Sequence, residues 1–228
     1  MRTLLVLFLS GCAIGTPSGE PCQKHQEHES FVQVRVDVPT QSPRPNASPD
    51  MDTFLGSGFA VANRGAYSFV LTAGHICLHG RPGGGINVLS FKGRAFPAVP
   101  IFVNEKEDMC VLLAKGFLPG LKLAERRPLV GDLIHTMSAP EGIFTPGMVL
   151  IFDGRYAGVS SAVNFAGYTV PAATGSSGSP ILNSSGEVIG MVTSVRSDFS
   201  HLGLGPPFEQ VQALIKAIRI VSARTKSE

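Results

Sequence analysis

A serine-rich turn, Gly-Ser-Ser-Gly-Ser-Pro at residues 175–180, is the stretch of the chain best suited to chemistry. Glycines tolerate backbone conformations that a Cβ would forbid, so the N–H groups of such a turn can point at one spot. A serine beside those donors suits acyl transfer, because the attacking oxygen and the donors for the developing negative charge must lie close together. Runs of small residues are otherwise mostly plain loops, so the turn needs a base and an acid elsewhere in the chain.

Two further segments supply a candidate base and a candidate acid. His75 follows the apolar run 67–72, which we predict to be a strand, so its side chain can face a cleft while its backbone is fixed. Asp108 stands immediately before the apolar run 109–114. Each also has an ordinary interpretation, the histidine as a packed or surface residue and the aspartate as a turn residue. Together with Ser177 they give the chain order His, Asp, Ser.

The elements that must hold these residues are mostly short strands. Hydrophobic residues make up 43% of the chain and charged residues 16%, and 26 glycines and 17 prolines punctuate it, which is typical of a β protein with many turns. Only residues 207–219 repeat apolar side chains at helical spacing. We predict strands at 31–38, 54–62, 67–72, 86–91, 95–103, 109–114, 133–137, 144–152, 162–170, 180–182, 188–195 and 201–205.

Three segments resemble the signature segments of trypsin-like serine proteases: Leu-Thr-Ala-Gly-His at 71–75, Asp-Met-Cys-Val-Leu-Leu at 108–113, and the serine turn. Gly-Ser-Gly-Phe at 56–59 and the stretch 130–142 resemble the bacterial high-temperature-requirement (HtrA/Deg) branch in particular. The resemblance spans roughly residues 31–222 and implies an all-β fold of two packed six-stranded antiparallel β-barrels with a C-terminal α-helix. We therefore expect a protease domain over 31–228, with barrels at about 31–118 and 128–205 and a helix at about 207–222.

The resemblance implies a role for each candidate site residue. Ser177 would be the nucleophile, His75 the general base, and Asp108 the acid that orients the imidazole and stabilises its charged form. The backbone N–H groups of Gly175 and Ser177 would form the oxyanion hole. Ser176 and Ser179 do not fit the nucleophile, because only Ser177 has a glycine two residues before it and one residue after it.

The resemblance also implies a substrate pocket between the barrels. Pro171, six residues before the proposed nucleophile, would lie at its base and carries no charge. With Leu204 narrowing the pocket, we expect a small or medium apolar residue before the scissile bond. The walls would be formed by Thr193, Ser194, Val195, Gly203, Leu204 and Gly205.

The chain departs from the family pattern at several points. Ser176 replaces the acid that pairs with a newly cleaved N-terminus in many digestive relatives, so zymogen activation of that kind is not expected. Ser179 replaces a frequent glycine. The chain ends soon after the predicted helix, so we expect no peptide-binding PDZ domains and make no prediction of a cage assembly or an oligomeric state.

The N-terminus has the pattern of an export signal. Met-Arg-Thr at 1–3 precedes the apolar run 4–9, which is too short to span a bilayer, and Leu-Ser-Gly-Cys at 9–12 resembles the bacterial lipobox. We expect a signal peptide over 1–12, a lipid on Cys12, and a flexible tether over 13–30. The alternative is ordinary cleavage near Cys12, which would leave a secreted protein without lipid. Both place the protein outside the cytoplasm, in the bacterial cell envelope or beyond it.

The net charge, the histidines and the cysteines bear on the partners, metals and cross-links that the protein can have. A formal net charge of +2 gives no reason to expect a nucleic-acid partner, and we expect no cofactor or metal, although His25 and His28 lie together in the tether. Cys77 and Cys110 could form a disulfide or remain buried thiols. The function predicted from the sequence is an exported serine endopeptidase acting on protein or peptide substrates. The alternative is a catalytically inactive protease-fold lipoprotein that acts as a binding module.

Overall fold

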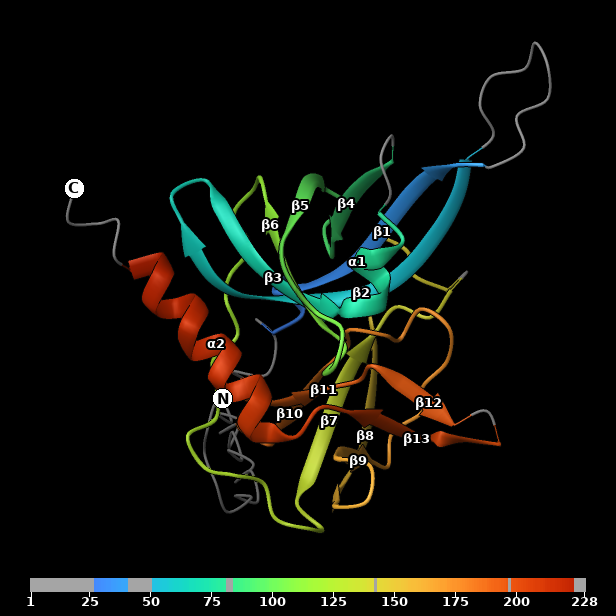
Figure 1. Cartoon of the computed structure of the whole chain (residues 1–228), viewed down its shortest axis with the longest axis vertical. Coiled ribbons are helices and arrows are strands. Elements are labelled where there is room, and N and C mark those ends of the chain that lie inside the picture. Colours follow the sequence, from blue (N-terminus) through green and yellow to red (C-terminus); the bar gives the residue numbers. More distant parts are fainter. Residues whose placement is uncertain (1–26, 41–50, 81–83, 142, 197, 224–228) are drawn as a thin grey trace, which may run out of the picture.

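The computed structural model describes residues 27–40, 51–80, 84–141, 143–196 and 198–223. The predicted signal peptide, Cys12 and most of the tether lie outside these ranges. Two β structures are packed together, with β1 to β6 in the upper half of Figure 1 and β7 to β13 in the lower half. The predicted all-β fold class with a C-terminal helix is therefore confirmed.

The first β structure is a closed barrel of antiparallel strands in the order β1-β2-β3-β6-β5-β4. All six strands predicted for this half of the chain are present, because each alternates or concentrates apolar residues between turns. In β1 the alternation directs Val32, Val34 and Val36 into the barrel core, where they are fully buried. The strands are β1 (Phe31–Pro39), β2 (Met51–Arg64), β3 (Tyr67–Ala73), β4 (Gly85–Ser90), β5 (Ala95–Asn104) and β6 (Met109–Ala114).

The second β structure is a curled sheet of seven strands in the order β11-β10-β7-β8-β9-β13-β12, where a closed six-stranded barrel was expected. Its two outermost strands, β11 and β12, are separated in the chain only by Val192 and Thr193. The serine turn lies against this linker: Gly178 N–H donates to Val192 O at 2.6 Å, and Val192 N–H donates to Ser179 O at 2.9 Å. The strands are β7 (Leu133–Ser138), β8 (Leu150–Ser160), β9 (Phe165–Tyr168), β10 (Pro180–Asn183), β11 (Val188–Met191), β12 (Ser194–Arg196) and β13 (Phe199–Gly205).

Two strands differ clearly from their predictions. The strand expected at 188–195 is divided at Val192 and Thr193 into β11 and β12, which lie at opposite edges of the sheet. The strand expected at 144–152 begins only at Leu150, as β8, and continues to Ser160. The residues before it form a turn in which Met148 N–H donates to Thr145 O and Gly147 has φ +83°. A proline followed by a glycine in the left-handed region ends an extended run, which explains the shift.

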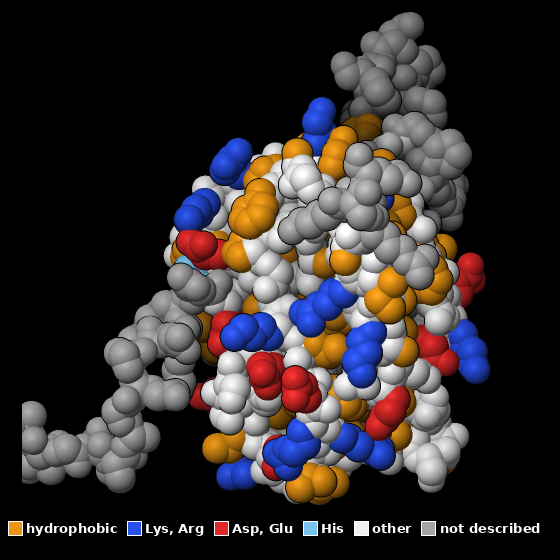
Figure 2. All heavy atoms as spheres, turned by 90° about the vertical axis from the view of Figure 1, so that its left-hand side faces the viewer, with side chains coloured by type: hydrophobic (Ala, Val, Ile, Leu, Met, Phe, Trp, Pro, Cys, Tyr) orange, Lys and Arg blue, Asp and Glu red, His pale blue; other side chains and the backbone are white. Residues whose placement is uncertain are grey.

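The C-terminal helix α2 (Phe208–Ala223) packs along the flank of both β structures (Figure 1). Its buried residues Val211, Ile215 and Ile218 belong to one apolar cluster with Phe59 of β2 and Met191 of β11. On the face that carries α2, positive and negative side chains are interspersed among apolar ones (Figure 2). Neither α2 nor any other helix within the described ranges combines the length and apolarity needed to cross a membrane.

Two short helices were not predicted from the sequence. The five-residue helix α1 (Gly74–Leu78) follows β3 directly. Glu27–Glu29, in the segment expected to be a flexible tether, form a 3₁₀ helix η1, and the Glu27 carboxylate pairs with His135 of β7 at 3.0 Å. The chain just before β1 is therefore held against the second β structure.

A disulfide joins Cys77 of α1 to Cys110 of β6, which decides between the two alternatives that the sequence left open. Both cysteines are buried in the core of the first barrel. The bond spans 33 residues of sequence. In the chain-entropy description, a closed loop of this length stabilises the folded state by about 4 kcal/mol by constraining the unfolded chain. It also ties the helix that carries His75 to the strand that follows Asp108.

Candidate active site

The pairing of β3 with β6 brings His75 and Asp108 together. These strands are neighbours in the barrel although β4 and β5 lie between them in the chain, and Ala73 at the end of β3 pairs with Met109 at the start of β6. His75, two residues beyond Ala73, therefore lies beside Asp108, which directly precedes Met109. The strand ladder, rather than a long loop, fixes the distance between these two residues.

The backbone at this point is adapted to a close approach. Asp108 has φ +49°, a left-handed conformation that Asp tolerates better than most residues other than glycine. Facing it is Gly74, where an added Cβ would come within 3.0–3.1 Å of the Asp108 carboxylate, the Asp108 carbonyl carbon and the Met109 nitrogen. A larger residue at position 74 would push α1 away from the carboxylate, which explains the glycine before His75.

The Asp108 carboxylate binds His75 at three points. Oδ1 accepts the His75 backbone N–H at 2.8 Å, and His75 Nδ1 lies 2.9 Å from Oδ2 and 3.1 Å from Oδ1. Burial is the largest single influence on the pKa of Asp108 and would raise it. The hydrogen bonds from the His75 ring and from the backbone N–H groups of His75 and Gly74, together with the charge of the ring, outweigh burial and hold that pKa below its usual value. The tautomer that carries its proton on Nδ1 donates it to the carboxylate and leaves Nε2 as an acceptor.

The serine turn needs glycine at two positions. Gly175 and Gly178 have φ of +90° and +93°, in the left-handed region. A Cβ on Gly175 would lie 2.6 Å from Ala139 O, and a Cβ on Gly178 would collide with the carbonyl oxygen of Ser57. Between them Ser177 is partly exposed. Both glycines therefore allow the turn to press against neighbouring backbone while Ser177 faces outward.

Two backbone donors of the turn remain available. Over the described ranges, the N–H groups of Gly175 and Ser177 donate to no protein acceptor, whereas Ser176 N–H donates to Ala173 O at 2.9 Å. The Ser177 hydroxyl donates to Thr193 O at 3.4 Å, and within the same ranges no hydrogen bond joins it to the His75 ring. In unliganded sites such hydrogen bonds are often long or absent and form only when substrate binds.

His75 and Ser177 line one cavity of about 500 Å³ between the two β structures. The predicted site residues Gly175, Thr193, Ser194 and Val195 line it as well, and Asp108 lies behind His75. The other residues that line it are Thr53, Phe54, Leu55, Ile76, His79, Glu141, Ala173 and Thr174.

Four of the residues predicted for the substrate pocket, Pro171, Gly203, Leu204 and Gly205, are not among those that line this cavity. Leu204 and Gly203 belong to β13, which lies beside β12 in the sheet, and Leu204 O accepts the N–H of Thr193 at 2.8 Å. Leu204 thus supports Thr193 through the backbone. A direct role for these four residues in the pocket remains a prediction.

Several residues on the first-barrel side of the cavity were not predicted as site residues. The Phe54 and His79 rings stack in parallel with centroids 3.8 Å apart, and Leu55 and Ile76 lie beside them on the cavity wall. The only sequence signal for this side of the cavity was the Gly-Ser-Gly stretch at 56–58. Glycines within a strand often mark a place where another segment's backbone approaches closely. That signal located the strand but did not identify the side chains that face the cavity.

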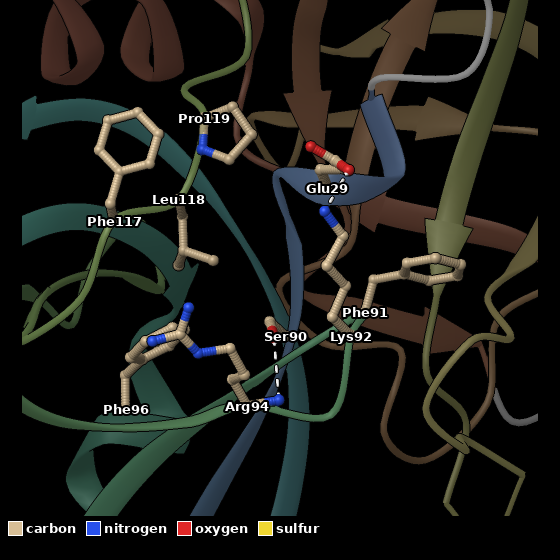
Figure 3. A pocket seen from close by; sticks show the side chains of 9 residues that line it. All are labelled: Glu29, Ser90, Phe91, Lys92, Arg94, Phe96, Phe117, Leu118 and Pro119. Atoms are coloured by element: carbon tan, nitrogen blue, oxygen red, sulfur yellow. Dashed lines mark hydrogen bonds and ion pairs between the residues drawn. The ribbon is translucent and has the colours of Figure 1, made fainter.

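A second cavity, of about 280 Å³, lies elsewhere and lacks a comparable constellation (Figure 3). Its polar groups are engaged with one another: Lys92 pairs with Glu29 at 2.7 Å, and Ser90 Oγ accepts the Arg94 backbone N–H at 3.1 Å. The hydrogen bond from Lys92 lowers the pKa of Glu29. Across the described ranges, no three His, Cys, Asp or Glu side chains gather closely enough to hold a metal ion.

Two packed antiparallel β structures, with a histidine and an aspartate on one and a serine turn on the other, define the chymotrypsin-like class of folds. A family model described as a trypsin-like peptidase domain matches residues 56–191, more than half of the chain. The chain belongs to this family.

Two curated relatives are serine proteases by name. A putative serine protease HhoA of Synechocystis is 29% identical over 170 residues, covering 70% of this chain and 41% of the relative. A probable periplasmic serine endoprotease of the DegP-like type from Chlamydia pneumoniae is 27% identical over 184 residues, covering 78% of this chain and 36% of the relative. The chain thus spans about two fifths of the length of these relatives.

A solved structure supports the fold. The serine endoprotease from Yersinia pestis superposes with a TM-score of 0.65 at 19% identity, covering 84% of this chain and 63% of that chain. At this level of identity the likeness concerns the fold alone.

The lowered pKa of Asp108 predicts a specific pH dependence of stability. A carboxylate whose native pKa lies below its unfolded value, ordinarily about 3.9, stabilises the fold above that value and loses this contribution as pH falls through the native pKa. The difference in unfolding free energy between wild type and Asp108→Asn should therefore be largest above about pH 4 and shrink at more acid pH. Urea unfolding followed by circular dichroism between pH 3 and 7 measures it. Asp153→Asn, at an exposed position of β8, is the control, and a difference for Asp108→Asn that is constant over this range would contradict the prediction.

Proposed function

We propose that this chain is a serine endopeptidase that hydrolyses peptide bonds through an acyl-enzyme intermediate. The observation that carries the proposal is the convergence on one cavity of three features: the carboxylate-bound ring of His75, the partly exposed Ser177, and two backbone N–H groups that donate to no acceptor among the described residues. Membership of the trypsin-like peptidase family and the names of the relatives point to the same reaction.

In the first half of the proposed reaction, Ser177 Oγ attacks the carbonyl carbon of the scissile peptide bond, and its proton moves to His75 Nε2. The resulting imidazolium is stabilised by Asp108, whose carboxylate already contacts Nδ1. The carbonyl oxygen becomes an oxyanion, which accepts hydrogen bonds from the N–H groups of Gly175 and Ser177. The C–N bond then breaks, and His75 gives the proton to the leaving amine.

In the second half, a water molecule attacks the ester formed with Ser177, and His75 Nε2 takes its proton. The same two N–H groups stabilise the second oxyanion. Collapse of this intermediate releases the carboxylic acid product, and His75 returns the proton to Ser177 Oγ. Asp108 stays ionised throughout, as its lowered pKa favours. Before this sequence can start, the Ser177 hydroxyl must leave the Thr193 carbonyl and turn to His75.

Replacing Ser177 tests the reaction most directly. Ser177→Ala should lower turnover of a peptide substrate by about six orders of magnitude and abolish covalent labelling by a fluorophosphonate probe, because the attacking oxygen is gone. Ser179→Ala is the matched control in the same turn, since the Ser179 hydroxyl is buried and, within the described residues, has no hydrogen-bond partner. It should keep both labelling and turnover.

The same experiment separates the rival functions. An inactive binding module on this fold would leave the wild-type protein unlabelled, and so would a structural lipoprotein in which the turn is only a loop. The hydrogen bond of Ser177 to Thr193 O, rather than to His75, is the one observation that favours the binding module. Equal turnover by wild type and Ser177→Ala would refute the enzyme proposal.

The proposed specificity is for a small or medium apolar residue before the scissile bond. Thr193, Ser194 and Val195, on the cavity wall beside Ser177, carry no ionisable group. An ionic side chain that lies against these three residues would lose hydration without gaining an ion pair from them. The ionisable residues that line the cavity are His75, His79 and Glu141.

Cleavage of a peptide library, with products identified by mass spectrometry, tests this preference. We expect kcat/KM for Ala, Val or Leu before the cleaved bond to exceed that for Lys, Arg, Asp or Glu at least about tenfold. A dominant preference for a charged residue at this position would contradict the proposed pocket.

We further propose that the protein is exported and tethered to a bacterial membrane by a lipid on Cys12. The signal-like sequence of residues 1–12 supports this, and one relative is named as periplasmic. The proposed lipid is attached to one small side chain, so Cys12→Ser removes the attachment point with little other change.

The anchor predicts a change in fractionation. In a bacterial host, wild-type protein should sediment with membranes, whereas Cys12→Ser should move to the soluble or secreted fraction because no thiol remains to accept the lipid. Immunoblots of the separated fractions measure this, with Cys22→Ser as the control. An unchanged distribution of Cys12→Ser would exclude the anchor and leave ordinary secretion.

A further inference from the structure

Ser57 of β2, a fully buried residue of the first barrel, contacts two segments of the second β structure: the serine turn and the residues that follow β7. Its hydroxyl donates to Gly175 O at 2.8 Å and accepts the backbone N–H of Ala139 at 3.0 Å. Its own N–H donates to Ser177 O at 2.7 Å. Every one of these contacts crosses from the first barrel to the second β structure.

The contacts of the hydroxyl restrain the peptide that carries one of the two donors, the Gly175 N–H. The Gly175 N–H belongs to the same planar peptide unit as Thr174 O, which accepts Glu141 N–H at 2.9 Å. Glu141 lies two residues after Ala139, whose N–H the Ser57 hydroxyl accepts. The next peptide unit, which carries the Gly175 carbonyl, is held directly by that same hydroxyl. The Ser57 hydroxyl therefore restrains Gly175 on both sides, directly at its carbonyl and through residues 139–141 at its N–H.

The carbonyl oxygen of Ser57 completes the arrangement. It accepts the Thr72 hydroxyl at 2.7 Å, and it occupies the space where a Cβ of Gly178 would lie. The backbone of Ser57 is thus fixed by β3 on one side and by the serine turn on the other. Because the backbone of Ser57 is held in place, its contacts fix the position of the serine turn relative to the first barrel.

We propose that Ser57 is a positioning residue for transition-state stabilisation: through its hydroxyl it holds the Gly175 N–H in the orientation that binds the oxyanion. This inference rests on the proposed endopeptidase function. Ser57 does not touch the reacting atoms and acts only through the turn. Loss of its hydroxyl should therefore reduce the rate of the chemical step while leaving binding of the substrate largely unchanged.

The chain offers a closely matched control. Ser68 of β3 is also fully buried in the first barrel, and its hydroxyl likewise accepts a backbone N–H, that of Leu118 at 2.8 Å. Its single hydrogen has two acceptors within reach, Gly116 O at 2.7 Å and Asn63 Oδ1 at 2.6 Å. None of these partners lines the candidate active site. Ser68→Ala thus removes an accepted and a donated hydrogen bond, as Ser57→Ala does, without touching the serine turn.

The experiment compares wild type, Ser57→Ala, Ser57→Thr and Ser68→Ala in the full-length protein. We measure kcat and KM for a peptide substrate, inhibition by a peptidyl boronic acid that forms a tetrahedral adduct, and the folded fraction by circular dichroism. Ser57→Ala should lower kcat per folded molecule about 10- to 100-fold, with KM changed less than about threefold. The inhibition constant of the boronic acid should rise by a factor similar to the loss in kcat. Ser57→Thr, which keeps the hydroxyl, should recover most of kcat, and Ser68→Ala should stay within about twofold of wild type.

The outcomes separate this inference from the function on which it rests. If wild type neither turns over substrate nor reacts with a fluorophosphonate, the proposed function fails and this inference fails with it. If wild type is active and Ser57→Ala has the same kcat per folded molecule as Ser68→Ala, the positioning role alone is refuted. A Ser57→Ala protein that only loses stability, or one that changes KM instead of kcat, also refutes it.

Discussion

The contact between the Asp108 carboxylate and His75 depends on the pairing of two strands that are distant in sequence. Because β3 and β6 are neighbours in a closed barrel, their ends cannot separate without breaking the ladder that begins at Ala73 and Met109. The left-handed backbone of Asp108 and the missing side chain at Gly74 then bring the carboxylate to both the backbone and the ring of His75. This part of the site is therefore a property of one barrel.

The serine turn belongs to the other β structure, so the site also requires that the two halves keep a fixed relation. A shared apolar cluster provides it, since Phe59 and Leu71 of the first barrel, Met137 and Met191 of the second sheet, and Ile215 of α2 are all fully or almost fully buried together. Buried apolar area of this kind is the main source of stability between packed elements. The polar contacts of Ser57 add direction to this apolar interface, because hydrogen bonds, unlike apolar burial, are specific in geometry.

Much of the first barrel could be predicted because residues such as Val32, Val34 and Val36 alternate with polar ones, and His75, Asp108 and Ser177 could be found from motifs that resemble a known family. Other features had no sequence signal. The helix α1 has five residues, little more than one turn, which is too short to express a helical period. The cavity wall formed by Phe54 and His79 depends on which strand face meets the second sheet. The role proposed for Ser57 depends on the backbone N–H of Ala139 and the carbonyl of Gly175, which only the packing of the two halves brings close to its hydroxyl.

The disulfide between Cys77 and Cys110 makes the covalent structure around the candidate site depend on the cellular compartment. It links the helix that carries His75 to the strand that follows Asp108, so a covalent bond joins the elements that hold the proposed base and the proposed acid. Such bonds form and persist in oxidising compartments and are rare where cellular reductants keep thiols free. A copy of the chain still among those reductants would hold base and acid together by hydrogen bonds alone. Completion of the site is thereby coupled to the chemistry of its surroundings, because the disulfide forms only where those surroundings are oxidising.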